Sequence, residues 1–559
     1  MNESTLNPIR LLKNINRGRE IMTVLLVYGF GDLLDRMGIL TYLNWGKRVI
    51  SFRKQEAAQN LTTAHRIRLA LQDLGPTFIK FGQVLSTRPD ILPADLIEEL
   101  THLQDRVPPF DGAEAQRLVE SELGHTVSEL YARFDVEPIA AGSLAQVHRA
   151  EHLDGTELAI KVRRPGISQL VEQDLSLLLE LAQLLVRQVP ESRVFDPVGL
   201  VHHFSRTIRR ELSFRREART AEEFRRQFAE DERVHIPVVF PELCSEGVLT
   251  MEFIEGVKAS DRDGLIGLHL DPTSIAQNGA RIFMHQAFEM GIFHGDPHPG
   301  NLRVQPDGKI VLLDYGMVGY LDEPKRELMV DVLLAIGKHD VDRTVAMVLE
   351  VGAPSQPIDR GLLRADVQDF IEAYYGVPLE QLQVGRMLND FVAILGNFGL
   401  RCPPDFMLLI RAMVTLEGVG RTLDPQFNLA AELVPYVEKM VRRRYDPRRV
   451  ARRTVDDLKV LLRAAHDLPL NLGATLKKIA QDDLNIHLEH RGLDRLITEF
   501  DRSSNRIVVG LVVSALVVAT ALVIRTAPIG SEWVGIPLFL LSGLLGIWLV
   551  IGILRSGRL

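Results

Sequence analysis

Apolar positions divide the chain into segments with different periodicities. Residues 157–162 and 248–254 are rich in apolar and β-branched residues in short runs, which is typical of buried strands. Residues 167–189 and 196–228 carry the 3.6-residue spacing of amphipathic helices. Helical spacing returns near residue 324 and continues to about residue 500. The pattern therefore predicts a small β-rich region, with strand-like residues from Asp135 onward, next to a long helical region.

Helical patterns also precede the β-rich region. Residues 1–60 have the composition of helices, and the pattern ending at Leu74 is followed by a Gly75-Pro76 break. Pro is favoured at the first position of a helix, so a new helix should begin there. A further helix is expected over residues 272–292, leading directly into a polar loop.

Two uncharged runs at the C-terminus differ from everything before them. Ile507–Ile524 and Trp533–Leu554 contain 18 and 22 residues without a charge. As helices they would be about 27 and 33 Å long, close to the hydrocarbon thickness of a bilayer. Arginines flank both outer ends, which the positive-inside rule places in the cytoplasm. We expect two transmembrane helices in the cytoplasmic (inner) membrane; the alternative is a buried core hairpin.

Composition narrows the classes of function. The 559 residues are 46% apolar and 25% charged, which is ordinary for globular domains. The formal charge of −8 argues against a nucleic-acid partner. The two cysteines lack metal-ligand spacing and suggest a reducing compartment, and no cleavable secretory signal is evident in the first twenty residues.

The polar loop at residues 294–301 reads His-Gly-Asp-Pro-His-Pro-Gly-Asn and is followed by Asp314-Tyr-Gly. Asp296 and Asn301 have the spacing of a protein-kinase catalytic loop, and Asp314 occupies the place of the metal-binding Asp. ATP brings Mg²⁺, which prefers hard oxygen ligands such as the Asn301 amide and the Asp314 carboxylate. Asp296 is then the candidate catalytic residue. The alternative is a simple polar turn, but two kinase-like motifs at the expected spacing argue against it.

Upstream residues fit the same chemistry. Ala159-Ile160-Lys161 resembles the strand whose Lys contacts the α- and β-phosphates, and such a Lys needs a helical carboxylate, for which Glu217 is the strongest candidate. An exposed Glu in an Arg-rich helix is the alternative for Glu217. The small-residue loop about twenty residues before Lys161 and the end of the strand at 248–254 complete the nucleotide site. Its remaining candidates are Ala140, Ala141, Gly142, Ser143, Val147, Met251, Glu252 and Ile254.

Taken together with Lys80-x-Gly82-Gln83, these motifs resemble the UbiB family of atypical protein-kinase-like proteins, over roughly residues 60–330. The resemblance implies an α+β, two-lobe kinase-like fold with an N-terminal helical extension and a C-terminal transmembrane hairpin. It also implies that Lys80 and Gln83 lie in a lid over the active site, with Lys80 paired to Glu211. We expect an extension (1–130), an N-lobe (131–258), a helical C-lobe (259–500) and the membrane hairpin (501–559).

Two positions depart from the family pattern. The family usually has Glu-x-Asp where this chain has Glu211-Leu-Ser213, so a weaker link between the extension and the N-lobe is expected. The family's Ala-Ala-Ala-Ser is here Ala-Ala-Gly142-Ser, and a glycine frees the backbone. We therefore expect a loop that is closer to that of an ordinary kinase.

One inference is independent of the family. No Ala-Pro-Glu follows Asp314-Tyr-Gly, and helix resumes within about ten residues, which leaves little room for a peptide-docking activation segment. The sequence thus favours a membrane-anchored ATPase or kinase that uses ATP and Mg²⁺ in isoprenoid-quinone (ubiquinone) synthesis. Expected partners are a membrane lipid or quinone precursor, an anionic phospholipid surface near the Arg-rich segment 442–453, and quinone-biosynthesis proteins. The alternatives are a small-molecule phosphotransferase and a nucleotide-binding scaffold.

Overall fold

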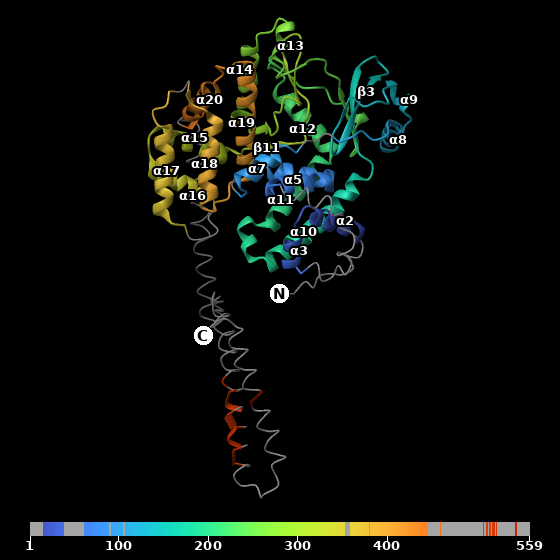
Figure 1. Cartoon of the computed structure of the whole chain (residues 1–559). Coiled ribbons are helices and arrows are strands. Elements are labelled where there is room, and N and C mark those ends of the chain that lie inside the picture. The colour runs from blue at the N-terminus through green and yellow to red at the C-terminus, as the bar shows by residue number, and fades with distance from the viewer. Residues whose placement is uncertain are drawn as a thin grey trace. The chain divides into compact units, whose positions relative to one another are not determined.

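The computed structural model describes residues 15–38, 61–88, 91–103, 107–352, 358–378 and 381–444. It also describes residues 446 and 459 and scattered positions in 507–522 and 543–544. Two compact units are distinguished, Met1–Val450 and Ala451–Leu559. Almost all secondary structure described below belongs to the first unit (Figure 1).

The N-terminal extension is helical. Its helices are α2 (Ile15–Val27), α3 (Gly31–Arg36), α5 (Thr63–Leu74), α6 (Pro76–Leu85) and α7 (Ala94–Thr101). As expected, α6 begins at Pro76, and the preceding Gly75 has a φ of 92° that a glycine adopts readily. Gly82 lies at a close helix contact, because an added Cβ would stand 2.2 Å from Leu103 Cδ1 and 2.9 Å from Leu71 Cδ1. Packing therefore explains the glycine of the Lys-x-Gly-Gln motif.

Two helices that come later in the chain pack on this extension. They are α10 (Ile167–Gln188) and α11 (Pro197–Glu211), joined by a 3₁₀ turn, η1 (Pro190–Phe195). Phe204 and Ile208 of α11 share one buried apolar cluster with Phe78 of α6 and Ile21 of α2. The end of α11, with Glu211, is therefore held against the helix that carries Lys80.

A five-stranded antiparallel sheet forms the N-lobe, in the order β1-β3-β4-β6 with β2 paired to β3. Its strands are β1 (Tyr131–Phe134), β2 (Ala140–Ala141), β3 (Ala145–His152), β4 (Glu157–Arg163) and β6 (Val248–Glu252). Helices α8 (Gly112–Leu123) and α9 (Val127–Leu130) bury Leu158 and Ile160 on one face. Helix α12 (Phe214–Gln227) belongs to the cluster that includes Leu249 and Met251.

The C-lobe begins with α13 (Arg262–Gly267) and α14 (Pro272–Met284). The single helix predicted for 272–292 is wrong in detail: His285–Met290 form a π-helical turn, and a strand begins at Ile292. The short strands that follow are β8 (Ile292–His294), β9 (Leu302–Val304), β10 (Ile310–Leu312) and β11 (Val318–Tyr320). Strand β8 pairs with β11, and β9 with β10. β10 and β9 also pair with β5 (Val234–His235) and β7 (Val257–Lys258), and η2 (Pro241–Leu243) is a 3₁₀ turn before β6.

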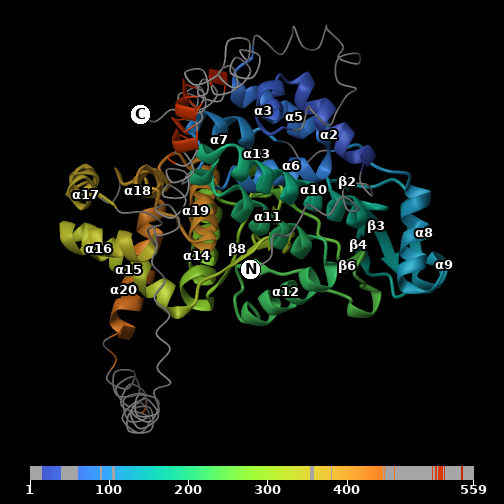
Figure 2. The same ribbon diagram turned by 90° about the horizontal axis from the view of Figure 1, so that it is seen from below.

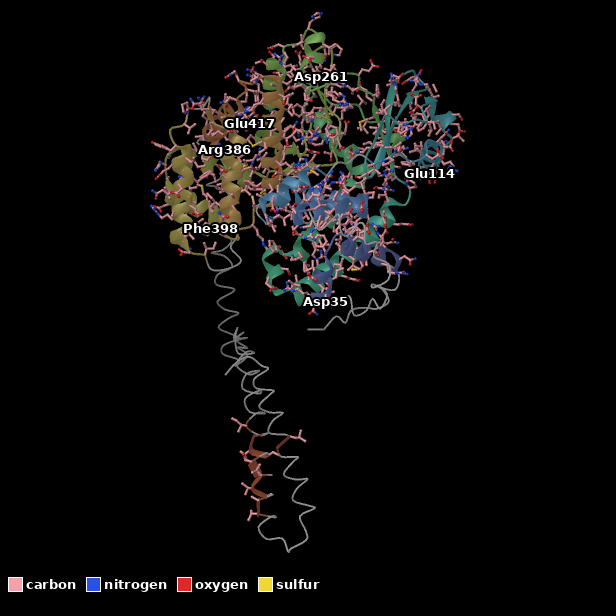
Figure 3. The ribbon with its side chains drawn as sticks, in the orientation of Figure 1. Asp35, Glu114, Asp261, Arg386, Phe398 and Glu417 are labelled. Carbon is pink, nitrogen blue, oxygen red and sulfur yellow. The ribbon has the colours of Figure 1, made fainter. Side chains whose placement is uncertain are left out.

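The rest of the C-lobe is a group of helices at one side of the first unit (Figures 1 and 2). They are α15 (Glu323–Gly337), α16 (Val341–Val351), α17 (Arg360–Tyr374), α18 (Val384–Asn397), α19 (Pro404–Leu423) and α20 (Leu429–Arg444). Glu417 of α19 lies among them (Figure 3) and accepts a hydrogen bond of 2.7 Å from the Gly385 amide of α18. An apolar cavity of about 50 Å³ here is lined by side chains such as Phe391 and Met413. None of the expected nucleotide-site residues lines it.

The predicted membrane hairpin lies almost wholly outside the described residues. The described positions in 507–522 are helical, and the side chains of Ile507 and Leu511 are about two-thirds exposed. Among the residues that the structure describes, no helix has the length and apolar character needed to cross a bilayer.

Candidate functional site

Two secondary-structure elements and one loop meet at Lys161. Its Nζ, on β4, donates to both carboxylate oxygens of Glu217 on α12, at 2.8 and 2.9 Å. The same ammonium lies 3.5 Å from Oδ2 of Asp314, which follows β10. Glu217 is 2% exposed, whereas the side chain of Asp314 is 42% exposed. Lys161 thus joins the N-lobe sheet, the helix and the Asp314 segment, as the sequence motifs predicted.

The charges of this cluster shift one another's protonation. Burial acts to lower the pKa of Lys161, but the carboxylates of Asp314 and Glu217 outweigh it and raise that pKa. Burial raises the pKa of Glu217 to about 7, although Lys161 opposes this shift. Burial also acts to raise the pKa of Asp314, but Lys161 and the Gly316 amide hold it well below its usual range. Asp314 is therefore an anion at neutral pH, as a metal ligand must be.

Two aromatic residues that were not among the predicted site residues support this cluster. The Lys161 ammonium lies 5.2 Å from the ring centre of Phe214, a cation–π contact. Tyr315 is 1% exposed, its hydroxyl donates to the Leu312 carbonyl at 2.8 Å, and its amide donates to Glu217 at 3.4 Å. Tyr315 therefore anchors the Asp314 segment in the core and links it to Glu217.

A tight turn holds the loop with Asp296 and Asn301. The His298 amide donates to the Asp296 carbonyl at 2.7 Å, and the Asn301 side-chain amide donates to the same carbonyl at 3.1 Å. The Asp296 amide in turn donates to Nδ1 of His294 at 3.1 Å, and burial lowers the pKa of that imidazole. Gly295 must be small, because an added Cβ would lie 2.6 Å from Leu408 Cδ2. The turn therefore fixes Asp296 and Asn301 relative to each other.

The donor set fits a hard divalent cation. Because the Asn301 NH₂ group is used within the loop, its carbonyl oxygen remains as an acceptor. Asp314 offers carboxylate oxygens: its Oδ1 accepts from the Gly316 amide at 2.8 Å, its Oδ2 lies 3.5 Å from the Lys161 ammonium, and its side chain is 42% exposed. Within the described part of the chain, no group of three or more His, Cys, Asp or Glu side chains forms a preassembled metal cage. A cation here would therefore take part of its shell from phosphate oxygens or water.

The predicted lid residue Lys80 lies beside this cluster. Its Nζ is 2.5 Å from Oε1 of Glu211, and the two side chains are 13% and 21% exposed. The Lys80 charge helps to lower the pKa of Asp314, and Glu211 helps to raise that of Lys161. Gly316 packs close to Glu211, whose Cγ would lie 3.6 Å from an added Cβ. The structure therefore brings the extension to the edge of the Asp314 segment.

Gln83, the other predicted lid residue, makes a different contact. Its side-chain amide donates to the Leu103 carbonyl at 3.2 Å, which ties α6 to the segment after α7. This contact of Gln83 is within the extension.

The small-residue loop is a turn between β2 and β3. Ala140 and Ala141 pair with β3, and the Gly142 amide donates to the Ala145 carbonyl at 2.8 Å. Gly142 does not have a positive φ, and an added Cβ would meet only the Ala145 carbonyl oxygen, at 3.6 Å. Gly142 therefore has a backbone conformation that other residues can adopt, and the expectation of a loop closer to that of an ordinary kinase stays a prediction. Ser143 is fully buried with its hydroxyl unpartnered among the described residues, so it does not face the site openly.

Strand register places Val147 directly opposite Lys161, so both side chains project from the same face of the sheet. Ala140 also pairs with Val147. The loop residue Ala140 and the strand residue Val147 therefore stand next to the Lys161 side of the cluster, where the sequence predicted them.

The end of the strand at 248–254, which was predicted to complete the nucleotide site, has its own internal partners. The Glu252 amide donates to the Val238 carbonyl at 2.8 Å, and the Phe253 amide donates to the Glu157 carbonyl at 2.9 Å. The Glu252 carboxylate accepts from His235 at 2.9 Å, and Met251 is buried in the core. The idea that Glu252 offers its amide to a nucleotide is therefore not supported. In this segment, Ile254 remains a candidate.

The Arg-rich end of α20 is engaged within the protein. Arg444 makes a two-pronged contact with Asp331, at 2.7 and 2.9 Å, and Arg443 lies 3.5 Å from Glu289. These pairings occupy part of the cationic surface that was expected to meet lipid headgroups. Residues 447–453 of that segment lie outside the described residues.

Known protein families match three parts of this chain. An ABC1 atypical kinase-like domain matches residues 102–348, a UbiB helical domain matches 367–428, and an ABC1/UbiB kinase-like C-terminal domain matches 491–555. A "Probable protein kinase UbiB" of Pseudomonas putida (strain W619) is 36% identical over 439 residues, covering 78% of this chain and 81% of that protein. The chain belongs to the UbiB family of atypical kinase-like proteins.

Other relatives extend the UbiB match. A "Probable protein kinase UbiB" of Xanthomonas euvesicatoria pv. vesicatoria (strain 85-10) is 33% identical and covers 93% of this chain and 95% of that protein. An "Uncharacterized protein in hydrogenase 1 5'region" of Clostridium pasteurianum is 29% identical and covers 98% of this chain and all of that protein. Membership of the UbiB family establishes a kinase-like enzyme fold with mixed helix and sheet.

Ser213 is where this UbiB chain departs from the expected Glu-x-Asp. It occupies the N-cap position of α12 without capping it, and its hydroxyl donates to Glu246 at 2.8 Å. Arg163 reinforces this corner by donating to the Leu212 and Glu246 carbonyls at 2.9 and 3.0 Å. The serine is thus part of a connected corner, and a carboxylate at 213 would face the carboxylate of Glu246.

The short segment after Asp314 is confirmed. β11 begins at Val318 and pairs with β8, and α15 begins at Glu323. Only β11 and a few loop residues separate the Asp314 motif from the next helix, α15. The UbiB chain therefore lacks, in this stretch, the long activation segment on which a peptide substrate docks in protein kinases.

Proposed function

We propose that this UbiB-family chain binds ATP with Mg²⁺ and hydrolyses it at the site around Lys161. The observation that carries the proposal is the position of Lys161, 2.8 Å from Glu217 and 3.5 Å from Asp314. Phosphoryl-transfer sites need one fixed cation for the phosphates and carboxylates for the metal, and this arrangement supplies both.

Each residue then has a defined role. Lys161, oriented by Glu217, would contact the phosphates of ATP, and Asp314 with Asn301 would hold Mg²⁺. The metal would supply positive charge to the phosphate oxygens. Asp296, fixed by the turn through His298, would orient the group that receives the phosphoryl group.

The acceptor in this proposal is water or a group on a membrane lipid rather than a protein hydroxyl. Two observations support this choice: the short connection between Asp314 and α15, and the Lys80–Glu211 pair at the edge of the Asp314 segment. The short connection leaves no docking platform for an extended peptide. The Lys80–Glu211 pair means that such a peptide would also have to displace α6.

We further propose that the chain is anchored in the inner membrane by residues 501–559 and that ATP hydrolysis is coupled to the handling of a lipid precursor in ubiquinone biosynthesis. The uncharged runs at 507–524 and 533–554 support the anchor, and the C-terminal family domain spans both. The UbiB name of the relatives supports the pathway. Quinone-biosynthesis proteins and an anionic phospholipid surface are the corresponding partners.

A quinone profile tests this proposal. Cells that lack the protein should accumulate precursor and lose quinone, and the wild-type chain should restore the profile while Asp314→Asn should not. Normal quinone content without the protein would refute the pathway. A chain lacking 501–559 should leave the membrane fraction, and full retention would refute the anchor.

The same experiments separate the two alternatives. A nucleotide-binding scaffold would restore quinone content with Asp314→Asn as long as ATP still binds. A small-molecule phosphotransferase would consume ATP in proportion to a soluble acceptor, with little hydrolysis when that acceptor is withheld.

A further inference from the structure

The turn between β2 and β3, residues 142–144, has little support from its own sheet. It is termed the nucleotide loop because of its place in the proposed ATP site. β2 is only two residues long, and at the tip the Gly142 amide makes one backbone hydrogen bond, to the Ala145 carbonyl. Strands usually have about three to ten residues, so a hairpin this short needs other elements to hold it in one conformation.

The side chain of Leu144 anchors the nucleotide loop in the N-terminal extension. It is 6% exposed and belongs to the same buried apolar cluster as Phe78 of α6 and Leu103, which follows α7. Among the described residues of the N-lobe sheet and its turns, Leu144 alone belongs to this cluster. A movement of α6 therefore changes the packing of the loop, and a movement of the loop changes the packing around α6.

Arg164 holds the backbone of the nucleotide loop from the other side. Its Nε donates to the Gly142 carbonyl at 2.9 Å, and its Nη2 donates to the Pro108 carbonyl at 2.8 Å. Its backbone amide donates to the Leu144 carbonyl at 2.9 Å. Because a peptide unit is planar and trans, a fixed Gly142 carbonyl also fixes the direction of the Ser143 amide. Arg164 thus sets the backbone on both sides of Ser143.

The segment that Arg164 contacts, residues 107–110, is itself fastened to β3. Gln146 is fully buried, accepts from the Phe110 amide at 3.1 Å and donates to the Phe110 carbonyl at 3.4 Å. The Arg164 guanidinium also lies 5.7 Å from the centre of the Phe110 ring, a cation–π contact. This segment begins four positions after Leu103, so it is a second connection between the loop and the extension.

We propose that Arg164 and Leu144 are positioning residues that couple α6 to the nucleotide loop. Neither side chain needs to touch the nucleotide, because Arg164 acts through backbone carbonyls and Leu144 acts through packing. The position of α6, which carries Lys80, then sets how the loop meets the phosphates, and nucleotide binding acts back on α6 by the same free energy. The inference rests on the proposed binding of nucleotide at this loop, but not on hydrolysis or on the acceptor.

Hydrogen exchange of the full chain in neutral-detergent micelles, with and without saturating ADP and Mg²⁺, tests the coupling. In the wild-type chain, nucleotide should slow exchange in residues 140–147 and also, by about fivefold or more, in residues 76–85 of α6. The variants are Leu144→Ala and Arg164→Lys, which keeps the charge but lacks the planar fork that joins two carbonyls. In both, saturating nucleotide should still slow 140–147 but should slow 76–85 by less than about twofold.

The matched controls are Leu158→Ala and Arg262→Lys. Leu158 is buried in a cluster that does not include Leu144, and Arg262 donates to the Leu423 carbonyl at 3.3 Å in the C-lobe. Both controls should keep the wild-type response of α6. Because both leucine variants remove a buried side chain, their unfolding midpoints should fall by similar amounts, so the response of α6 separates positioning from loss of stability.

Two results would overturn the coupling while leaving the nucleotide site intact. One is slowing confined to 140–147 in the wild-type chain. The other is a response of α6 that has the same size in the variants and the controls. A wild-type chain in which nucleotide does not slow 140–147 would overturn the nucleotide site, and the coupling with it.

Discussion

Lys80 Nζ lies 2.5 Å from Oε1 of Glu211. This ion pair is distinct from the neighbouring pair of Lys161 and Glu217. Two Lys–Glu pairs thus border Asp314, one from the extension and one from the N-lobe. Both lysines contribute to the low pKa of Asp314. The extension is therefore electrostatically connected to the site that we propose for the metal.

The coupling between Lys80 and Glu211 can be measured directly. Lys80→Met and Glu211→Gln should each cost about 1–3 kcal/mol of unfolding free energy, because each leaves a half-buried charged partner unpaired. The double variant should lose less than the sum, which a double-mutant cycle by urea unfolding would show. The exposed pair Arg36–Glu191 serves as control and should show no measurable coupling. Additive effects at Lys80 and Glu211 would mean that the contact is not formed.

Gly82→Ala tests whether packing sets the position of Lys80. A Cβ there would overlap Leu103 and Leu71, so we expect a loss of about 1–3 kcal/mol in unfolding free energy and a weaker Lys80–Glu211 coupling. Gly418→Ala is the matched control, because this helical glycine has open space around it, and alanine there should be neutral or stabilising. Equal stability of the two variants would contradict the close contact.

The sequence predicted the parts of the site that are local. The short segment after Asp314 depends on adjacent residues and is found as predicted, and the nearby Asp296 and Asn301 are joined by a hydrogen bond within their loop. Pairing of Lys161 with Glu217 followed from the chemistry of phosphoryl transfer, which requires a carboxylate for the lysine.

Contacts between residues far apart in the chain were harder to predict from the sequence. Lys80 and Glu211 are 131 positions apart, and their pairing came from the family resemblance rather than from any pattern along the chain. The amides of Glu252 and Phe253 donate to the carbonyls of Val238 and Glu157, which only the folded sheet reveals. The residue type at position 142 likewise does not tell whether its φ is positive, and the folded chain shows that it is not.

Glu217 should give stability a distinctive pH dependence. Its pKa rises from 4.5 to about 7 on folding, so between these values the folded state holds a proton that the unfolded state has released. Stability should therefore fall as pH rises through this window and level off above it. Urea unfolding of the wild-type chain and of Glu217→Gln from pH 5 to 8 measures the difference, and the variant should lack this decline. A decline of equal size in both proteins would assign it to other groups.

Gly142→Ala should be tolerated. The backbone there is open to any residue and a methyl group has room, so stability should stay within about 1 kcal/mol of wild type, with a tendency to increase. Thermal unfolding and the affinity for ATP analogues provide the measurements. A loss above about 2 kcal/mol would show that the loop needs glycine after all.

The central claim is that Asp314 belongs to a magnesium–ATP site. The most direct measurement is Mg²⁺-dependent ATP hydrolysis by the full chain in micelles, for wild type and Asp314→Asn. Asp307→Asn is the control, because that Asp lies in the turn between β9 and β10, shortly before Asp314, and pairs with Lys309 instead. We predict turnover in the wild type and the control and a decrease of roughly 100-fold or more in Asp314→Asn. Hydrolysis by Asp314→Asn at the wild-type rate, with the same Mg²⁺ dependence, would contradict the account.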